Sequence, residues 1–177
     1  MGGLKSPLTI FIMKKRYIIL IIIVSCLWAI WRSNYFAANF RTETFYKPIF
    51  SQDFDVMKEG STINTLLKPS FHVRHGFFLV FPCTNWFSTT DNLDGQIKYS
   101  FLSNGEIIET KTMDIPARLM AGYNGKKCDV VLFTFDLPYK RVTGPISLKV
   151  TLLSPITKLA QYRDVIRCEV APAYWPK

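Results

Sequence analysis

The strongest constraint on the fold is a series of short strand-like segments that begins near residue 46. Residues 96–102 alternate between apolar and polar side chains, as in a strand with one buried face. Asn104-Gly105 follow, and both residue types tolerate the positive φ angles of a tight hairpin turn. Residues 107–113 would then form the returning strand. This part of the chain therefore predicts an antiparallel hairpin.

Several other segments have strand character. The continuous apolar run GFFLVF at residues 76–81, ended by Pro82, is typical of a strand covered on both faces. Alternating patterns predict further strands at residues 129–137, 146–152 and 163–170, and earlier ones at 50–56 and 61–67. Turn-forming residues separate these segments, and a helical turn fits residues 116–122 or 156–162. The pattern predicts an all-β, antiparallel sandwich of immunoglobulin-like or jelly-roll type.

A second constraint lies at the N-terminus, where residues 17–31 are apolar except for Ser25. Basic residues flank this stretch, which at about 1.5 Å per residue is slightly shorter than a bilayer core of about 30 Å. Two interpretations remain open: an uncleaved hydrophobic membrane helix or a secretory signal peptide. Both leave the positive charges inside and export residues 33–177. We therefore divide the chain into a signal peptide or membrane anchor (1–32), a tether (33–45) and an exported domain (46–177).

One local motif bears on this choice. Residues 13–26 (MKKRYIILIIIVSC) resemble a bacterial lipoprotein signal peptide, with a basic start, an apolar centre and a lipobox-like Ile-Val-Ser-Cys. The resemblance implies cleavage before Cys26 and acylation of that residue, with Met13 as an alternative start. The other interpretation is that Cys26 is a small apolar residue of a membrane helix. In its architecture the chain is also similar to small bacterial envelope lipoproteins of unknown function, a resemblance that carries no functional motif.

The charge distribution bears on possible partners. The net charge is +9, but five basic residues and no acidic ones fall in residues 1–32, so residues 33–177 carry only +4. More than half of the charge therefore belongs to the N-terminal segment, and we do not expect a nucleic-acid partner. We expect contact with a lipid bilayer through the N-terminus and a protein partner in the bacterial envelope.

Residues that could perform catalysis or bind a metal are few. The only histidines, His72 and His75, would point to opposite faces of a strand and would not converge on a metal ion. We expect both to be surface residues that precede a buried strand. The chain contains none of the common hydrolase, metalloprotease or nucleotide-binding motifs. We therefore assign no catalytic residue, cofactor or metal site.

The cysteines suggest a disulfide in an oxidising compartment. Cys83, Cys128 and Cys168 are widely spaced and do not form a zinc-binding pattern. We expect Cys128 and Cys168 to pair because both lie beside predicted strands of the C-terminal half. The alternative is that all three are buried, unpaired thiols.

Aromatic residues near predicted loops suggest a binding surface, formed by Trp86, Phe87, Tyr174 and Trp175. Alternatively, these rings cover the core. With no catalytic motif, the sequence favours a non-enzymatic, membrane-anchored binding module. One version of this hypothesis is an immunity protein against an exported antibacterial toxin. The alternatives are a small envelope hydrolase or lipid-handling enzyme and a structural subunit of an envelope assembly.

Overall fold

The computed structural model describes residues 7–82, 93–115, 120–123, 127–137, 139, 142 and 144–173, with the backbone alone for residues 7–16 and 120–123. The chain forms two compact units, Met1–Thr44 and Phe45–Lys177.

The N-terminal part of the chain is helical. It contains α1 (Pro7–Arg32) and α2 (Asn34–Phe40), and α3 (Thr42–Phe45) leads into the second unit. Ser33 separates α1 from α2 and caps α2, because its Oγ accepts a hydrogen bond from the backbone N–H of Phe36 at 3.1 Å. The segment expected to be a tether therefore contains short helices.

No single helix in the part of the chain with described side chains is both long and apolar enough to cross a membrane. The stretches Tyr17–Arg32 and Asn34–Phe40 meet the length and hydropathy criteria together, with a bend of 66° between them.

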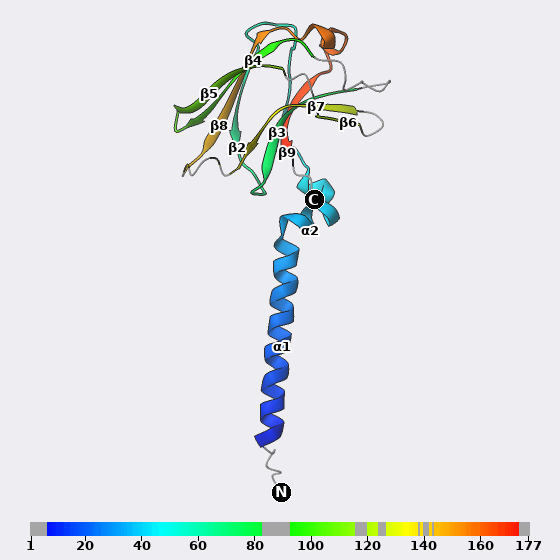
Figure 1. Ribbon diagram of the computed structural model, residues 1–177, viewed down its shortest axis with the longest axis vertical. Helices are drawn as coiled ribbons and strands as arrows, with labels where there is room; N and C mark the ends of the chain where they lie inside the picture. The colour runs from blue at the N-terminus through cyan, green and yellow to red at the C-terminus, as the bar shows by residue number, and fades with distance from the viewer. Residues whose placement is uncertain are drawn as a thin grey trace. The chain divides into compact units, whose positions relative to one another are not determined.

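The second unit is built from β-strands in two antiparallel sheets (Figure 1). The first sheet has the order β1-β9-β3-β7-β6 and the second β2-β8-β4-β5. The strands are β1 (Phe50–Asp53), β2 (Thr62–Leu67), β3 (Arg74–Pro82), β4 (Gln96–Ser103), β5 (Glu106–Asp114), β6 (Met120–Tyr123), β7 (Lys127–Asp136), β8 (Ile146–Ser154) and β9 (Arg167–Pro172). This arrangement confirms the all-β prediction and is consistent with a sandwich.

Apolar residues on the facing sides of the two sheets form one core. Aromatic rings join the layers: Tyr99 of β4 stacks on Phe133 of β7 with ring centroids 4.2 Å apart, and Phe101 contacts Phe135 edge to face at 5.0 Å. The fully buried side chains include Phe77, Leu79, Phe81, Ile97, Leu132, Leu148, Val150, Leu152, Ile156 and Leu159. The alternation seen in the sequence therefore identifies the core-facing positions correctly in β4 and β8.

The predicted hairpin is confirmed. β4 and β5 are joined by Asn104 and Gly105, whose φ angles are 52° and 88°. The helical turn considered near residue 156 is also present, as a 3-10 helix η1 (Thr157–Tyr162).

Two local details differ from the sequence pattern. Strand β6 (Met120–Tyr123) occupies part of the other segment considered for a helical turn, and it pairs with β7. The last strand begins at Arg167 rather than at residue 163. The chain still turns before it, where the N–H groups of Val165 and Ile166 both donate to the carbonyl of Tyr162.

Candidate binding cavity

The outer face of the five-stranded sheet carries a cavity of about 690 Å³, which we call the outer-face cavity. Strands β3, β7 and β9 provide most of its wall, and the segment before β1 and Ala173 after β9 provide the rest. Its lining residues are Tyr46, Pro48, Arg74, Phe78, Val80, Lys127, Asp129, Val131, Thr134, Glu169, Ala171, Pro172 and Ala173. All of them belong to the second unit.

Strand alternation produces this lining. In β3 the side chains of Phe77 and Leu79 point into the core, so Phe78 and Val80 point to the opposite face. Sheet register places Glu169 of β9 opposite Phe78 on one side. Phe78 and Val80 are therefore apolar side chains on the face of the sheet turned away from the core.

A bulge shapes the other side of the cavity. The register between β3 and β7 shifts after Phe77, which pairs with Phe133, so that Phe78 pairs with Val131 and Val80 with Asp129. The extra residue in β7 lets both Leu132 and Phe133 be buried while Val131 and Asp129 line the cavity.

Asp129 is the unusual polar group of the cavity. It is half-buried, and within the described part of the chain its carboxylate makes no hydrogen bond or ion pair with another residue. Burial removes water from the carboxylate and raises its pKa, although a hydrogen bond from its own backbone N–H acts in the opposite direction. A cationic group placed beside this carboxylate would stabilise its charged form.

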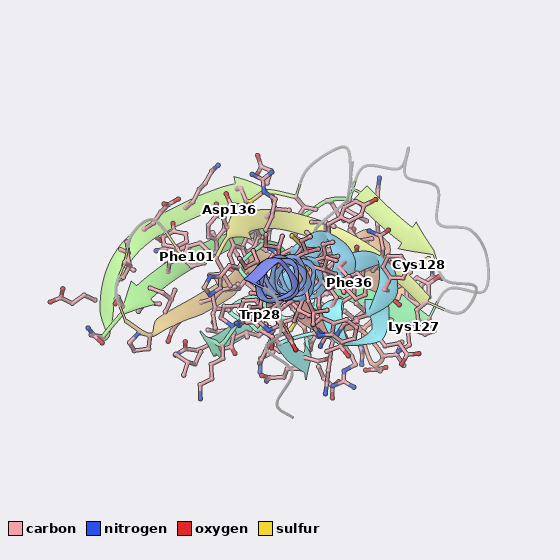
Figure 2. All side chains as sticks on the ribbon, turned by 90° about the horizontal axis from the view of Figure 1, so that it is seen from below. Trp28, Phe36, Phe101, Lys127, Cys128 and Asp136 are labelled. Atoms are coloured by element: carbon pink, nitrogen blue, oxygen red, sulfur yellow. The ribbon has the colours of Figure 1, made fainter. Side chains whose placement is uncertain are left out.

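The other charged groups of the lining are differently engaged. Arg74 Nε donates to Asp136 Oδ1 at 3.2 Å, and this exposed pair raises the pKa of Arg74. Glu169 Oε1 accepts a hydrogen bond from Ser51 Oγ at 3.0 Å. Lys127 is exposed at the start of β7, and Figure 2 shows it at the opposite end of this strand from Asp136. The cavity therefore combines an apolar floor with charged groups of both signs.

The histidines do not contribute to this cavity. His72 is exposed, as expected, but His75 is completely buried, so its prediction as a surface residue was wrong. The reason is that β3 begins at Arg74, which places His75 on the core-facing side of the strand. Its Nδ1–H donates to the carbonyl of Val73 at 2.8 Å.

The remaining ring nitrogen of His75 is buried without a hydrogen-bond partner among the described residues. The ring lies nearly parallel to that of Phe135, with centroids 6.3 Å apart. Burial lowers the pKa of His75, and its hydrogen bond to Val73 offsets part of this effect. The neutral imidazole is therefore the form that fits the core.

The predicted Cys128–Cys168 disulfide was also wrong. Cys168 is a free thiol, fully buried on β9, and its Sγ donates to the carbonyl of Gln52 at 3.3 Å. Desolvation raises the pKa of Cys168 to about 12. Cys128 does form a disulfide, with a partner outside the described residues. These two cysteines, which lie in strands of the same sheet, are therefore in different redox states.

The other candidate site residues are not among the described residues that line the outer-face cavity. Cys26 is exposed on α1. The predicted aromatic surface, consisting of Trp86, Phe87, Tyr174 and Trp175, lies outside the described residues. Among the residues that the structure describes, no cluster of three or more His, Cys, Asp or Glu side chains is arranged to hold a metal ion.

The sequence contains two features of the cavity, although each of them predicted only a strand. The run at residues 76–81 indicated apolar side chains on both faces of β3, but not that the outer ones would line a cavity. Asp129 opens the strand predicted at residues 129–137, and its position gave no indication that its carboxylate would be half-buried in a cavity. No protein-family model matches the chain, and neither does any curated protein or solved structure.

Proposed function

We propose that the protein is a membrane-anchored envelope protein that acts as a non-enzymatic binding module through its outer-face cavity. The observation that carries this proposal is the lining itself. Phe78, Val80 and Val131 present apolar surface on the solvent side of the sheet, bordered by charged groups. Concave apolar sites with a few polar groups at defined positions are typical of ligand-binding surfaces.

The surface of α1 supports the membrane anchor. The large apolar side chains from Tyr17 to Trp31 are between 50% and 65% exposed, and they lie on all sides of the helix. A helix that is apolar all around is stable in the interior of a protein or in lipid, but not in water. A lipid bilayer would cover this surface, with residues 33–177 on the exported side. The disulfide at Cys128 supports export because disulfides persist in oxidising compartments.

The anchor has two candidate forms, an acylated Cys26 and an uncleaved helix. Residues that follow Cys26 form further contacts typical of a membrane interface: the guanidinium of Arg32 lies over the Trp28 ring at 5.0 Å, and that of Arg41 over Trp31 at 5.6 Å. Both forms of the protein keep these residues. The membrane contact proposed for them is therefore independent of how the N-terminus is processed.

Intact-mass measurement of the membrane-extracted protein distinguishes the two forms. Lipoprotein processing would remove residues 1–25 and add acyl chains at Cys26, whereas an uncleaved anchor would keep its full mass. Incorporation of a labelled fatty acid that persists in Cys26→Ala would contradict acylation at this residue.

The binding role is tested by site-specific photo-crosslinking in intact cells. A crosslinking amino acid at Val80, inside the cavity, is expected to trap a partner. The matched control is Thr112, an exposed position on β5 of the other sheet. Equal products from the two positions, or none from Val80, would contradict a binding role for the cavity.

A specific version of this function is immunity against an exported antibacterial toxin, in a sandwich of immunoglobulin-like or jelly-roll type. The size of the chain, the proposed anchor and the recognition surface support this version. A toxin gene directly upstream and a tight complex of the two products are its expected consequences. Cells that express the protein and still die when dosed with that toxin would contradict it.

The alternative of a histidine-dependent hydrolase receives no support from the cavity. Neither His72 nor His75 lines it, and the free nitrogen of His75 is enclosed by the core. We therefore place the binding role first.

A further inference from the structure

We infer that the outer-face cavity recognises a cationic group attached to an apolar one, supplied by a segment of a partner protein that presents Lys or Arg beside an apolar residue. This inference rests on the proposed binding function and names the chemistry of the ligand.

The floor of the cavity selects for an apolar group. Phe78, Val80 and Val131 occupy neighbouring register positions on β3 and β7, with Ala171 and Pro172 on β9 at one side. Covering this surface with an apolar guest releases water, and this makes the free energy of binding more favourable. A fully charged guest would leave this surface without a complementary contact.

Two carboxylates select for a positive charge. Register places Glu169 beside Phe78 on the β9 side and Asp129 beside Val80 on the β7 side, so an acidic group borders the apolar strip on each side. Asp129 makes no side-chain contact with a described cation, and its half-buried position reduces its exposure to water. A guest ammonium or guanidinium would supply a counter-charge that the described residues do not, with a stronger interaction than in bulk water.

The cations of the lining do not cancel this preference. Arg74 is already paired with Asp136, at the end of β7 away from Asp129. Lys127 lies two residues before Asp129 and is exposed, so solvent screens its charge. The least screened charge in the apolar part of the cavity is therefore negative.

The dimensions of the cavity favour a short segment as the guest. A volume of about 690 Å³ is within the range of pockets that hold drug-sized ligands. It accommodates a few side chains but not a folded domain. The partner would therefore insert an exposed loop or a chain terminus.

Matched small probes test the chemistry directly. The full-length protein is held in nanodiscs of zwitterionic lipid, and binding of 4-phenylbutylamine and 4-phenylbutyrate is compared by saturation-transfer NMR, with empty nanodiscs as the background. We expect the amine to bind at least tenfold more tightly than the carboxylate, which has the same apolar part. Equal affinities, or tighter binding of the carboxylate, would overturn the inference.

Two isosteric variants locate the charge contact. Asp129→Asn and Glu169→Gln are each expected to weaken amine binding at least fivefold and to leave carboxylate binding unchanged or stronger. Asp114→Asn, an exposed carboxylate on β5, is the matched control and is expected to have no effect. Circular dichroism confirms that each variant is folded. Unchanged amine binding in both cavity variants would contradict the assignment.

A peptide comparison then tests the source of the guest. The peptides acetyl-Phe-Lys-Val-amide and acetyl-Phe-Glu-Val-amide differ only in the sign of their central charge, and we expect only the first to compete with 4-phenylbutylamine. Failure of this peptide to compete would overturn a partner segment as the ligand. Crosslinking at Val80 together with no preference for amines would reject the charge assignment alone, whereas loss of both would reject the proposed function as well.

Discussion

The ring of Phe78 lies directly over Gly76 on the outer face of β3. A Cβ atom at position 76 would be 2.7 Å from Cε2 of this ring and 2.9 Å from its Cζ, which is closer than carbon atoms approach without displacement. The ring covers the glycine, and Phe78 is only 9% exposed although it points away from the core. The lack of a side chain at Gly76 therefore allows the floor of the cavity to lie flat against the sheet.

Gly76→Ala is expected to push the Phe78 ring outward into the cavity. Overpacking of this kind costs about 1–3 kcal/mol of stability, and the displaced ring would also weaken binding of 4-phenylbutylamine. Thermal unfolding and probe titration measure the two effects. In a Phe78→Leu background the same alanine should cost much less, because the ring is gone. An equal cost in both backgrounds would show that the strain arises elsewhere.

The buried imidazole of His75 predicts a pH-dependent stability. Its pKa in the folded protein lies below the ordinary value of about 6.5, so between these two pKa values the unfolded chain binds more protons than the folded one. This contribution to stability is complete above about pH 6.5. It is lost as the pH falls through the folded pKa.

Denaturant unfolding between pH 5 and pH 7.5 measures this effect. His75→Leu should have a shallower loss of stability on acidification than the wild type, and the difference between the two curves isolates the imidazole from the carboxylates. His72→Gln is the matched control, because this histidine is exposed. If the dependence of stability on pH changed in His72→Gln but not in His75→Leu, the assignment of this effect to the buried imidazole of His75 would be contradicted.

Local patterns in the sequence were sufficient to predict much of the sandwich. Alternation and the Asn104-Gly105 turn located β4 and β5 because side-chain period and turn chemistry act over a few residues. Strand β6 was missed because its four residues contain no alternation, and pairing with β7 alone defines it. Register between distant strands depends on packing that no local pattern reports.

The difference between local patterns and long-range packing also explains why the predictions for His75 and for the cysteine pair were wrong. His75 was expected at the surface because it precedes the apolar run at residues 76–81, but β3 begins at Arg74 and its alternation directs His75 inward. Cys128 lies in β7 and Cys168 in β9, and β3 separates these two strands in the sheet. The presence of a cysteine in each of two strands was therefore not enough to identify a disulfide pair.

The cysteines should react very differently with an alkylating reagent. Cys168 is buried and its pKa is about 12, so at pH 8 it should not react until the protein unfolds. Mass spectrometry after a pulse of iodoacetamide, with and without denaturant, measures this. Rapid labelling of Cys168 in the native protein would contradict its burial.

Peptide mapping without reductant checks the redox states independently. The peptide containing Cys128 should be recovered as part of a disulfide and the one containing Cys168 as a free thiol. With Cys26 also free, the four cysteines of the sequence leave Cys83, outside the described residues, as the expected partner. A Cys128–Cys168 peptide would contradict this prediction.

Asp94 joins a loop to the start of η1. Its carboxylate accepts hydrogen bonds from the backbone N–H groups of Thr157 at 3.1 Å and Lys158 at 3.2 Å, and from the Thr157 hydroxyl. Desolvation alone would raise the pKa of Asp94, but these bonds outweigh it and lower the pKa. Asp94→Ala should cost about 1 kcal/mol, as for loss of a helix cap, and Asp94→Asn less. Chemical denaturation measures both, and equal costs would contradict the cap.

The aromatic and arginine side chains around Ser33 predict the depth of Trp31, near the end of α1, in a membrane. The ring centroids of Trp31 and Phe36 are 5.1 Å apart, and those of Phe36 and Phe40 are 4.8 Å apart. The guanidinium of Arg41 lies over the Trp31 ring. Aromatic rings combined with arginine favour the boundary between lipid chains and headgroups, where the rings are partly desolvated and the charge remains in water. We therefore expect Trp31 to lie near this boundary.

Quenching of tryptophan fluorescence by brominated lipids measures the depth of Trp31. In a variant that keeps Trp31 and has phenylalanine at the other three tryptophan positions, lipids brominated near the headgroup should quench more strongly than lipids brominated near the chain ends. The control replaces Trp31 as well and carries Ile107→Trp, at an exposed position of β5, which should not be quenched. Equal quenching of the two variants would show that the aromatic residues around Ser33 have no special contact with lipid. Stronger quenching of Trp31 by the deep label would instead place this residue within the apolar core of the bilayer.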